Sequence, residues 1–360
     1  MRLFLAEGAE KQSFLRIFLK IKKRMIRIIE TQPDDANFHW FEDLPSLLYT
    51  AQELVFKRSE SLNKAFLKTC FVLFKNDEPQ ARIALYDNPH LYYDNKKAVC
   101  LGNYECVNDA MISQNILEVA IKAAKKLNAE YVIGPMNGST WDTYRFSLHH
   151  DAPNIFLEPY HHLYYNEQFQ TVGFELISRY FSSEDTDLKH DFPRVLETEK
   201  AFRAEGVTFK NIGEVDFERE LGRLYDFNLS AFQTNFLYTP ISKTDFISKY
   251  APVKSIIDSQ FLIIAEDKNQ ALIGFFFCLP DFANTTEKSL VIKTIARHPA
   301  PQWRGLGHVI GNFIYKNAVQ NGYQSIIHAF MMEDGYSKTI SKNYSGQPFK
   351  NYGLYGLNID

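Results

Sequence analysis

Short apolar runs alternate with amphipathic stretches along the C-terminal half of the chain. Three of the runs are separated by turn residues and predict consecutive β-strands over 261–265, 271–278 and 289–296. Downstream, apolar residues recur at helical spacing from Val309 to Ala318, and Gly322 stands where a helix C-cap is expected. A further apolar run predicts a strand over 325–330. The second half is therefore expected to form three strands, a helix and another strand, in that order.

The N-terminal half has the same order of elements, although no sequence repeat is visible. Strands are predicted over 65–74, 81–86 and 98–105, followed by a strongly amphipathic helix over 112–127 and a strand over 131–133. Each half of the chain is therefore expected to form one copy of the same type of domain.

A polar run at residues 182–187 is interpreted as the boundary between the two halves, because it follows the apolar strand predicted over 174–181. The chain is divided accordingly into a first domain, residues 1–188, and a second, residues 189–360. Two helices, 216–232 and 243–251, are expected early in the second domain.

A glycine-rich turn, Gln302-Trp303-Arg304-Gly305-Leu306-Gly307-His308, joins the strand ending near Ala296 to the following helix. Its glycines let the backbone approach a ligand and adopt conformations that a side chain forbids. The helix that begins near His308 directs free N–H groups and the positive end of its dipole toward an anion. The turn therefore predicts a cradle for a pyrophosphate, while the alternative that its glycines serve turn geometry alone stays open.

The order strand, strand, strand, glycine turn, helix, strand resembles the GNAT superfamily of acyl-CoA N-acyltransferases. The turn of that family reads Arg or Gln, two residues, Gly, one residue, then Gly or Ala, and Gln302, Gly305 and Gly307 occupy these places. The strings 130–145 and 156–175 are similar to the first half of bacterial two-domain acetyltransferase-like proteins. The resemblance implies an α/β (α+β) fold of two tandem GNAT-like domains, each a mixed, mostly antiparallel sheet flanked by helices. The first domain lacks the glycine turn and is interpreted as a degenerate copy.

The resemblance also implies acetyl-CoA, or a longer acyl-CoA, as the acyl donor and an amine as the acceptor. The donor-binding residues that it implies are Ile295, Ala296, Arg297, Gln302, Trp303, Arg304, Gly305, Leu306, Gly307 and His308. Arg297 stands where the family usually has an apolar residue, and it could reach a carboxylate or phosphate of a substrate.

Tyr344 matches the family's frequent general acid and follows a short helix expected over 337–343, before a closing hairpin expected over 349–357. The strand 289–296 carries no acidic residue, so a general base must come from elsewhere. The candidates are His298, His328 and Glu333.

Two segments are candidates for contact with the acceptor. Asn137, Ser139, Trp141 and Arg145 bring hydrogen-bonding groups, an aromatic ring and a cation to the end of a predicted strand. An ordinary turn with an N-cap and a core aromatic explains each of them singly. In the second domain, the segment between the two early helices offers Gln233, Asn235 and Tyr238, for which ordinary loop packing is an equal alternative.

Composition and charge restrict the remaining classes of function. A net charge of −3 over 360 residues gives no basic field, which argues against non-specific binding to nucleic acid or to an anionic membrane. Cys70, Cys100, Cys106 and Cys278 lack zinc-like spacing, so buried, reduced thiols are expected, which fits a cytoplasmic protein. The adjacent histidine pairs at 149–150 and 161–162 have no recognised ligand spacing, so no metal is expected.

Hydropathy gives no sign of a membrane anchor. No apolar stretch reaches the roughly 18 residues that span a bilayer. Residues 1–29 are apolar in part, but charges interrupt them and no small-residue cleavage site follows. An amphipathic helix or a strand is expected there rather than a secretory signal, and no stable membrane insertion is expected.

The resemblance implies a GNAT-type N-acetyltransferase that moves an acetyl group from acetyl-CoA to a small-molecule or peptide amine by direct attack on the thioester. Two alternatives stay open. One is a tandem-fold enzyme that takes acyl or aminoacyl groups from a carrier protein or a tRNA. The other is a non-catalytic protein that binds CoA. The sequence leaves open the acceptor, the acyl chain length and the oligomeric state.

Overall fold

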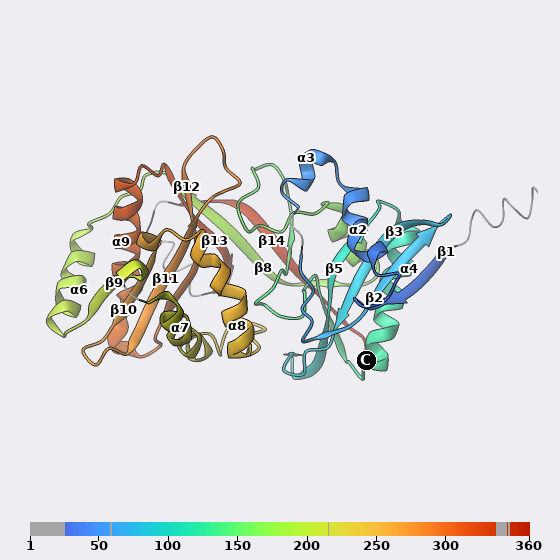
Figure 1. The fold of residues 1–360 in the computed structure, drawn as a ribbon, viewed down its shortest axis with the longest axis horizontal. Helices are drawn as coiled ribbons and strands as arrows, with labels where there is room; N and C mark the ends of the chain where they lie inside the picture. The colour runs from blue at the N-terminus through green and yellow to red at the C-terminus, as the bar shows by residue number, and fades with distance from the viewer. Residues whose placement is uncertain (1–25, 58–59, 215, 336–343, 345) are drawn as a thin grey trace, which may run out of the picture. The chain divides into compact units, whose positions relative to one another are not determined.

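The computed structural model describes residues 26–57, 60–214, 216–335, 344 and 346–360 (Figure 1). The chain forms two compact units, each discontinuous in sequence. Unit 1 contains the described residues up to Tyr144, together with Tyr164–Glu175 and Tyr355–Asp360. Unit 2 contains Arg145–Leu163 and Leu176–Leu354.

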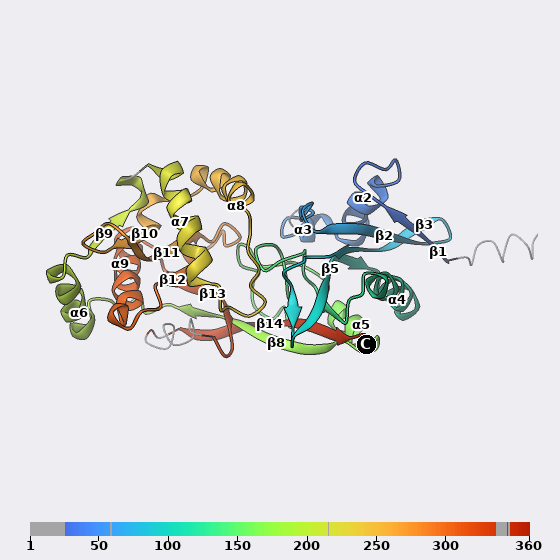
Figure 2. The same ribbon diagram turned by 90° about the horizontal axis from the view of Figure 1, so that it is seen from below.

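Unit 1 is a mixed sheet with helices on both faces. Its strand order is β1 (Ile26–Thr31), β2 (Leu67–Lys75), β3 (Glu78–Tyr86), β5 (Lys96–Cys106), β6 (Tyr131–Gly134) and the end of β14 (Gln347–Asn358). The pair β5–β6 is parallel, and the other neighbours are antiparallel. Helix α2 (His39–Leu48) lies on one face and α4 (Ala110–Lys126) on the other (Figure 2). The smaller elements are α3 (Ala51–Leu54), β4 (Tyr92–Tyr93) and α5 (Tyr164–Thr171).

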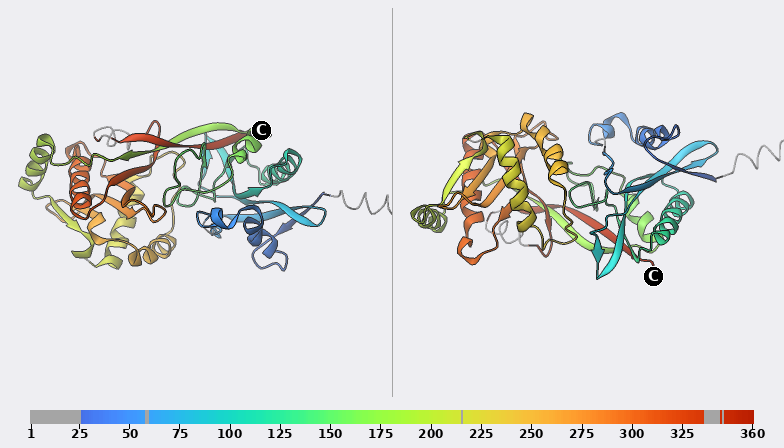
Figure 3. Two further views of the ribbon diagram at one scale, coloured as in Figure 1. Left: turned by 90° about the horizontal axis from the view of Figure 1, so that it is seen from above. Right: turned by 60° about the horizontal axis from the view of Figure 1, so that its bottom comes forward.

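Helix α4, the blue-green helix of unit 1 in Figure 3, forms where the amphipathic pattern predicts it. Its apolar face buries Ile112, Ile116, Leu117, Ala120 and Ala124. The carboxylate of Asp109 accepts hydrogen bonds from the N–H groups of Met111 and Ile112, and Lys125 and Lys126 lie in the last turn. The carboxylate at the N-terminus and the lysines at the C-terminus both complement the helix dipole. The helix predicted over 112–127 is confirmed.

Unit 2 has a second mixed sheet. Its order is the start of β14, β8 (Glu175–Asp185), β13 (Ser325–Met332), β12 (Ser289–Arg297), β11 (Leu272–Pro280), β10 (Leu262–Glu266) and β9 (Thr208–Asn211). Strands β12 and β13 are parallel, whereas β9–β10, β10–β11, β11–β12 and β8–β13 are antiparallel pairs. The remaining short elements are β7 (Phe146–Ser147), η1 (Ile212–Glu214), η2 (Ala251–Ser255), η3 (Ser259–Phe261) and η4 (Pro301–Trp303).

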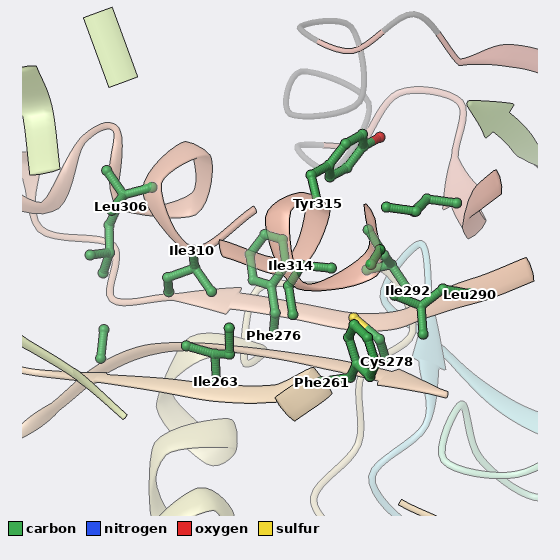
Figure 4. Packing of buried hydrophobic residues seen from close by; sticks show 14 of the residues in the cluster. Phe261, Ile263, Phe276, Cys278, Leu290, Ile292, Leu306, Ile310, Ile314 and Tyr315 are labelled. Carbon is green, nitrogen blue, oxygen red and sulfur yellow. The ribbon is translucent and has the colours of Figure 1, made fainter. Parts of the chain in front are cut away.

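Helices cover both faces of this sheet as well (Figure 2). Helices α7 (Phe217–Ala231) and α8 (Lys243–Tyr250) lie on one face, and α6 (Pro193–Ala204) and α9 (Leu306–Gln320) on the other. Side chains of α9 meet those of the strands in a hydrophobic core of the unit (Figure 4). There Leu306, Ile310 and Ile314 are fully buried, and each such side chain contributes roughly 2 kcal/mol of hydrophobic stabilisation.

Most elements predicted from the hydrophobic pattern are confirmed in both halves of the chain, but two expectations near the ends of the units are wrong. The hairpin expected over 349–357 is a single strand, β14. The strand expected to end at residue 181 continues to Asp185, so the first residues of the polar run at 182–187 belong to strand β8. The side chains of Ser182 and Asp185 are buried there and hydrogen-bonded to Tyr352 and Tyr315, so polarity did not mark a loop. The helix expected over 337–343 and most of the segment 1–29 lie outside the described residues.

Each half of the sequence contributes a strand to the unit formed mainly by the other half. Strand β8 follows helix α5 of unit 1 but pairs with β13 of unit 2. The end of β14, which leaves unit 2, pairs with β6 of unit 1. The compact units therefore each contain residues from both sides of position 188. The division at residue 188 stays a prediction of where one copy of the domain ends in the sequence.

All four cysteines are buried and free, as expected. None of the helices in the described part of the chain is long and apolar enough to cross a membrane, and no cluster of potential metal ligands occurs among the described residues.

Candidate active site

Strands β12 and β13 of unit 2 pair only at their beginnings. Parallel pairing runs from Ser289 with Ser325 to Ile292 with His328 and then stops. Beyond that point β12 stays paired with β11 up to Arg297, while Met331 and Met332 of β13 stay paired with β8. Among the described residues, no hydrogen bond joins the ends of the two strands. The sheet therefore opens here, and one backbone edge of β12 is left without a strand partner.

The N-terminus of α9 follows directly from the open end of β12. Gly305 is the N-cap, with φ 96° in the left-handed region, and no side-chain hydrogen bond caps the helix. Leu306, Gly307 and His308 form the first turn, and the exposed Arg304 precedes it. Burial, with a smaller effect of Arg194, lowers the pKa of His308. An uncapped helix N-terminus of this kind provides N–H donors and a positive dipole end for an anion.

The connection between β12 and α9 is held by its own side chains. Arg297 donates from Nη1 to the carbonyl oxygens of His298 and Ala300, at 2.7 and 3.2 Å. The Nδ1 atom of His298 accepts from the N–H of Ala300. Trp303 packs near Phe202, with ring centroids 6.2 Å apart, and Gln302 is exposed. Arg297 therefore shapes the turn, which does not support the expectation that it reaches a substrate anion.

Four polar side chains meet at the point where β12 and β13 separate. Tyr315 on α9 donates a hydrogen bond to Asp185 at 3.0 Å and lies 2.8 Å from Nε2 of His328. Because the carboxylate only accepts, the Tyr315 oxygen is left to accept the Nε2–H of His328. Tyr344 stacks on Tyr315, with centroids 4.2 Å apart and planes at 16°.

We call this group the apex cluster: Asp185, Tyr315, His328 and Tyr344. Burial lowers the pKa of His328 to about 4, against an opposing effect of Asp185. Burial, reinforced by Asp185, raises the pKa of Tyr344 well above its ordinary value. At neutral pH, His328 is therefore an uncharged imidazole and Tyr344 retains its proton. The hydroxyl of Tyr344 lies against Gly311 of α9, where a Cβ would collide with it.

The other two candidates for a general base lie apart from this arrangement. His298 has one ring nitrogen occupied in the turn before α9. Glu333 follows the end of β13 and lines an open pocket of about 700 Å³ with Arg179, Tyr180 and Ser183. The structure thus brings Tyr344 and His328 together, and it does not bring a carboxylate on β12 to them.

In unit 1 the equivalent opening is closed. Strands β5 and β6 pair in parallel only from Ala98 to Cys100, but Met136 then donates to the carbonyl of Leu101. Asn137 accepts from the N–H of Asn103 through Oδ1, and it donates to Glu60. At the start of α4, Asp109 already satisfies two N–H groups and forms an ion pair with Lys75 at 2.7 Å. The helix of this copy that corresponds to α9 therefore has its N-terminus capped.

The predicted acceptor residues fall into different parts of the molecule. Asn137, Ser139 and Trp141 belong to unit 1, where Ser139 bonds to Asp142 and to the N–H of Trp141. Arg145 belongs to unit 2 and is surrounded by the rings of Tyr180, Phe330 and Tyr352. Gln233 and Asn235 are exposed and Tyr238 is half-buried in the α7–α8 loop of unit 2. Their roles stay predictions.

Two features of unit 2 had no recognised signal in the sequence. One is the apex cluster, whose members are distant in sequence and of which Asp185 and Tyr315 were not predicted. The other is a fully buried ion pair between Lys350 and Glu158, with Nζ and Oε1 2.8 Å apart. Glu158 also accepts from the N–H of Ile155, so the pair fixes the loop that follows β7 against β14.

The open sheet, the parallel pair β12–β13 and the helix after the glycine turn define a GNAT-like architecture. No family model and no curated protein matches the sequence. Solved structures do match. A GCN5-related N-acetyltransferase from Anabaena variabilis gives a TM-score of 0.56 at 7% identity, covering 93% of this chain and 73% of that chain.

Two further structures are similar over nearly the whole chain. A tandem GNAT protein from the clavulanic acid biosynthesis pathway, determined without AcCoA, gives a TM-score of 0.52 at 9% identity, covering 92% of this chain and 98% of that chain. The glucosamine N-acetyltransferase region of a fungal multi-domain GH3 β-N-acetylglucosaminidase gives 0.55 at 14% identity and covers 93% of this chain. This chain spans 38% of that larger protein. The chain has the tandem GNAT fold, and the predicted fold class is confirmed.

Proposed function

We propose that unit 2 is an acyl-CoA-dependent N-acyltransferase, in the simplest case one that moves an acetyl group from acetyl-CoA to an amine. The observation that carries this proposal is the combination at one place of an unpaired edge of β12 and an uncapped N-terminus of α9. A strand edge can pair with the amide groups of an extended ligand, and the helix end can bind its pyrophosphate.

The residues proposed to hold the donor follow from this geometry. The N–H groups of the first turn of α9 would contact the pyrophosphate, and the exposed Arg304 would add a positive charge. The backbone from Ile295 to Arg297 would contact the acyl arm. When bound, acyl-CoA supplies an acyl thioester that an amine can attack.

Tyr344 is proposed as the general acid. Its phenol is protonated at neutral pH and therefore carries a proton for the departing thiolate. Stacking on Tyr315 and contact with Gly311 hold the ring against α9, the helix whose N-terminus is proposed to bind the donor. His328 is neutral and buried beside the same ring and would help to position it.

Calorimetric titration with acetyl-CoA, CoA and octanoyl-CoA tests donor binding. Because Gly305 has a positive φ, any side chain there is strained, so the informative change is Arg304→Glu on the exposed side of the turn. We expect about tenfold weaker binding, from the reversal of one charge close to a diphosphate. Arg219→Glu, an exposed reversal at the start of α7, is the matched control and should bind normally. Absence of binding in the wild type would leave the glycine turn with a structural role only.

Tyr344→Phe tests the chemistry separately from binding. We expect kcat to fall about a hundredfold while acetyl-CoA affinity is unchanged, because phenylalanine keeps the stack on Tyr315 and loses only the proton. Equal turnover by this variant would remove Tyr344 from the mechanism. Binding of acetyl-CoA with no transfer to any amine would favour a non-catalytic CoA-binding protein.

A further inference from the structure

The acceptor must reach the proposed acyl group from the face of the unit 2 sheet that α9 does not cover. On the α9 face, the opening between β12 and β13 adjoins the packed core that contains Leu306, Ile310 and Phe276. The opposite face carries α7, α8 and the loop between them. A charged side chain of β12 on this second face would therefore contact the acceptor and influence which acceptor is bound.

Lys293 lies on that face, at the start of the opening. The register of β12 against β11 shifts there, because Ile292 pairs with Cys278 and Thr294 with Phe277, so Lys293 is the extra residue of a β-bulge. A bulge turns the side chain out of the regular alternation. The ammonium of Lys293 lies 5.9 Å from the ring of Phe277 and 5.4 Å from the ring of Tyr250 at the end of α8.

This ammonium has aromatic neighbours. Within the described part of the chain, no carboxylate lies within ion-pair distance of Nζ of Lys293. The side chain is half-buried, so its charge loses part of its hydration, and the two ring faces offset that loss only in part. Arg297, the other charged residue of β12, is occupied with the carbonyl groups of the turn. Lys293 is thus a positioned cation on the side from which the acceptor would approach.

On the basis of the function proposed above, we propose that Lys293 selects an acceptor that carries an anionic group, a carboxylate or a phosphate, besides its amine. The ammonium pairs with that anion and so places the amine beside the opening of the sheet. The bulge position, where an acidic strand residue could have served as a base, instead holds a binding cation. The attacking amine must then arrive as the neutral form or lose its proton to solvent.

Matched pairs of amines test this specificity. Acetyl transfer, followed as release of free CoA, is measured with L-phenylalanine against L-phenylalaninamide, glycine against glycinamide, and O-phosphoethanolamine against ethanolamine. The first two pairs probe a carboxylate and the third a phosphate. We expect the anionic member of at least one pair to be the better acceptor in kcat/KM, compared at equal concentrations of neutral amine.

Lys293→Met then removes the charge and keeps the aliphatic stem against Phe277 and Tyr250. We expect KM for the anionic acceptor to rise about tenfold to a hundredfold, with kcat and the affinity for acetyl-CoA unchanged, and Lys293→Arg to restore most of the loss. Lys288→Met is the matched control, because the ammonium of Lys288 also lies over a tyrosine ring, 4.5 Å from Tyr323, but donates to the carbonyl of Asn321.

The outcomes separate this inference from the proposed function. Lack of acetyl-CoA binding would refute the function and with it the inference. Transfer that prefers the neutral members, or that Lys293→Met leaves unchanged, would overturn the inference alone. If acetyl-CoA binds but none of the six amines is acetylated, the anionic members are titrated into the CoA complex. Binding lost in Lys293→Met supports the inference, and absence of binding by all of them overturns it.

Discussion

Acidification is expected to destabilise the protein through His328. This imidazole is 2% exposed, and burial lowers its pKa from 6.5 to about 4. The folded pKa lies below the unfolded one, so the unfolded state binds more protons between these values. The stabilisation is therefore complete above pH 6.5 and is lost as the pH falls toward 4. At about 1.4 kcal/mol per pH unit, the whole effect is roughly 3 kcal/mol, of which roughly 2 kcal/mol falls between pH 7 and pH 5.

His328→Gln tests this expectation, because glutamine can donate to the Tyr315 oxygen in place of Nε2–H and does not titrate. Asp185, Tyr315 and Tyr344, the polar groups that face His328, are present in both proteins. The free energy of unfolding is measured by urea titration at pH 7, 6 and 5, with far-UV circular dichroism as the probe. Wild type should lose roughly 2 kcal/mol more than the variant over this range. Parallel pH dependences of the two proteins would refute the reasoning.

Two further predictions concern charges outside the apex cluster. Lys350→Met leaves the Glu158 carboxylate buried without its ammonium, so we expect the free energy of unfolding to fall by about 3–5 kcal/mol, seen as a lower Tm. Combining Glu158→Gln with Lys350→Met should recover most of this stability. Equal Tm values for the single and double variants would contradict the argument. Asp109→Ala removes the cap of α4 in unit 1 and should lower the free energy of unfolding by about 1 kcal/mol, measured by thermal unfolding. Calorimetry should show unchanged acetyl-CoA affinity. A weakened affinity would instead place donor binding in unit 1.

The regular elements were predictable because their patterns are local. Strand β10 is a short continuous apolar run, helix α9 has apolar residues at helical spacing, and the glycine turn lies between β12 and α9 as expected. The left-handed conformation of Gly305 agrees with the reason given for a glycine at this turn. Burial of the four cysteines followed equally from their apolar neighbours.

Local hydrophobic patterns could not predict that each half of the sequence contributes a strand to the other unit. Strand β8 pairs with β13, whose residues lie about 140 positions further along the chain. The side chains of β8 that lie in the polar run resemble those of a linker. The apex cluster has the same origin, since Asp185 reaches Tyr315, the hydrogen-bond partner of His328, only because β8 lies beside β13. Polar residues on a central strand are stable when each finds a partner, and those partners come from distant parts of the sequence.

The two copies of the fold differ at corresponding places, and the differences follow one physical rule. In unit 1, Asp109 satisfies the first N–H groups of α4, and the segment from Met136 to Asn137 fills the space beside β5. In unit 2, the first turn of α9 has no side-chain cap, and the ends of β12 and β13 stay apart. Unsatisfied backbone groups cost stability unless a ligand or water pairs with them. Unit 1 pairs these groups internally, whereas the corresponding groups of unit 2 are open to a ligand or to water, which is the arrangement on which the proposed donor site rests.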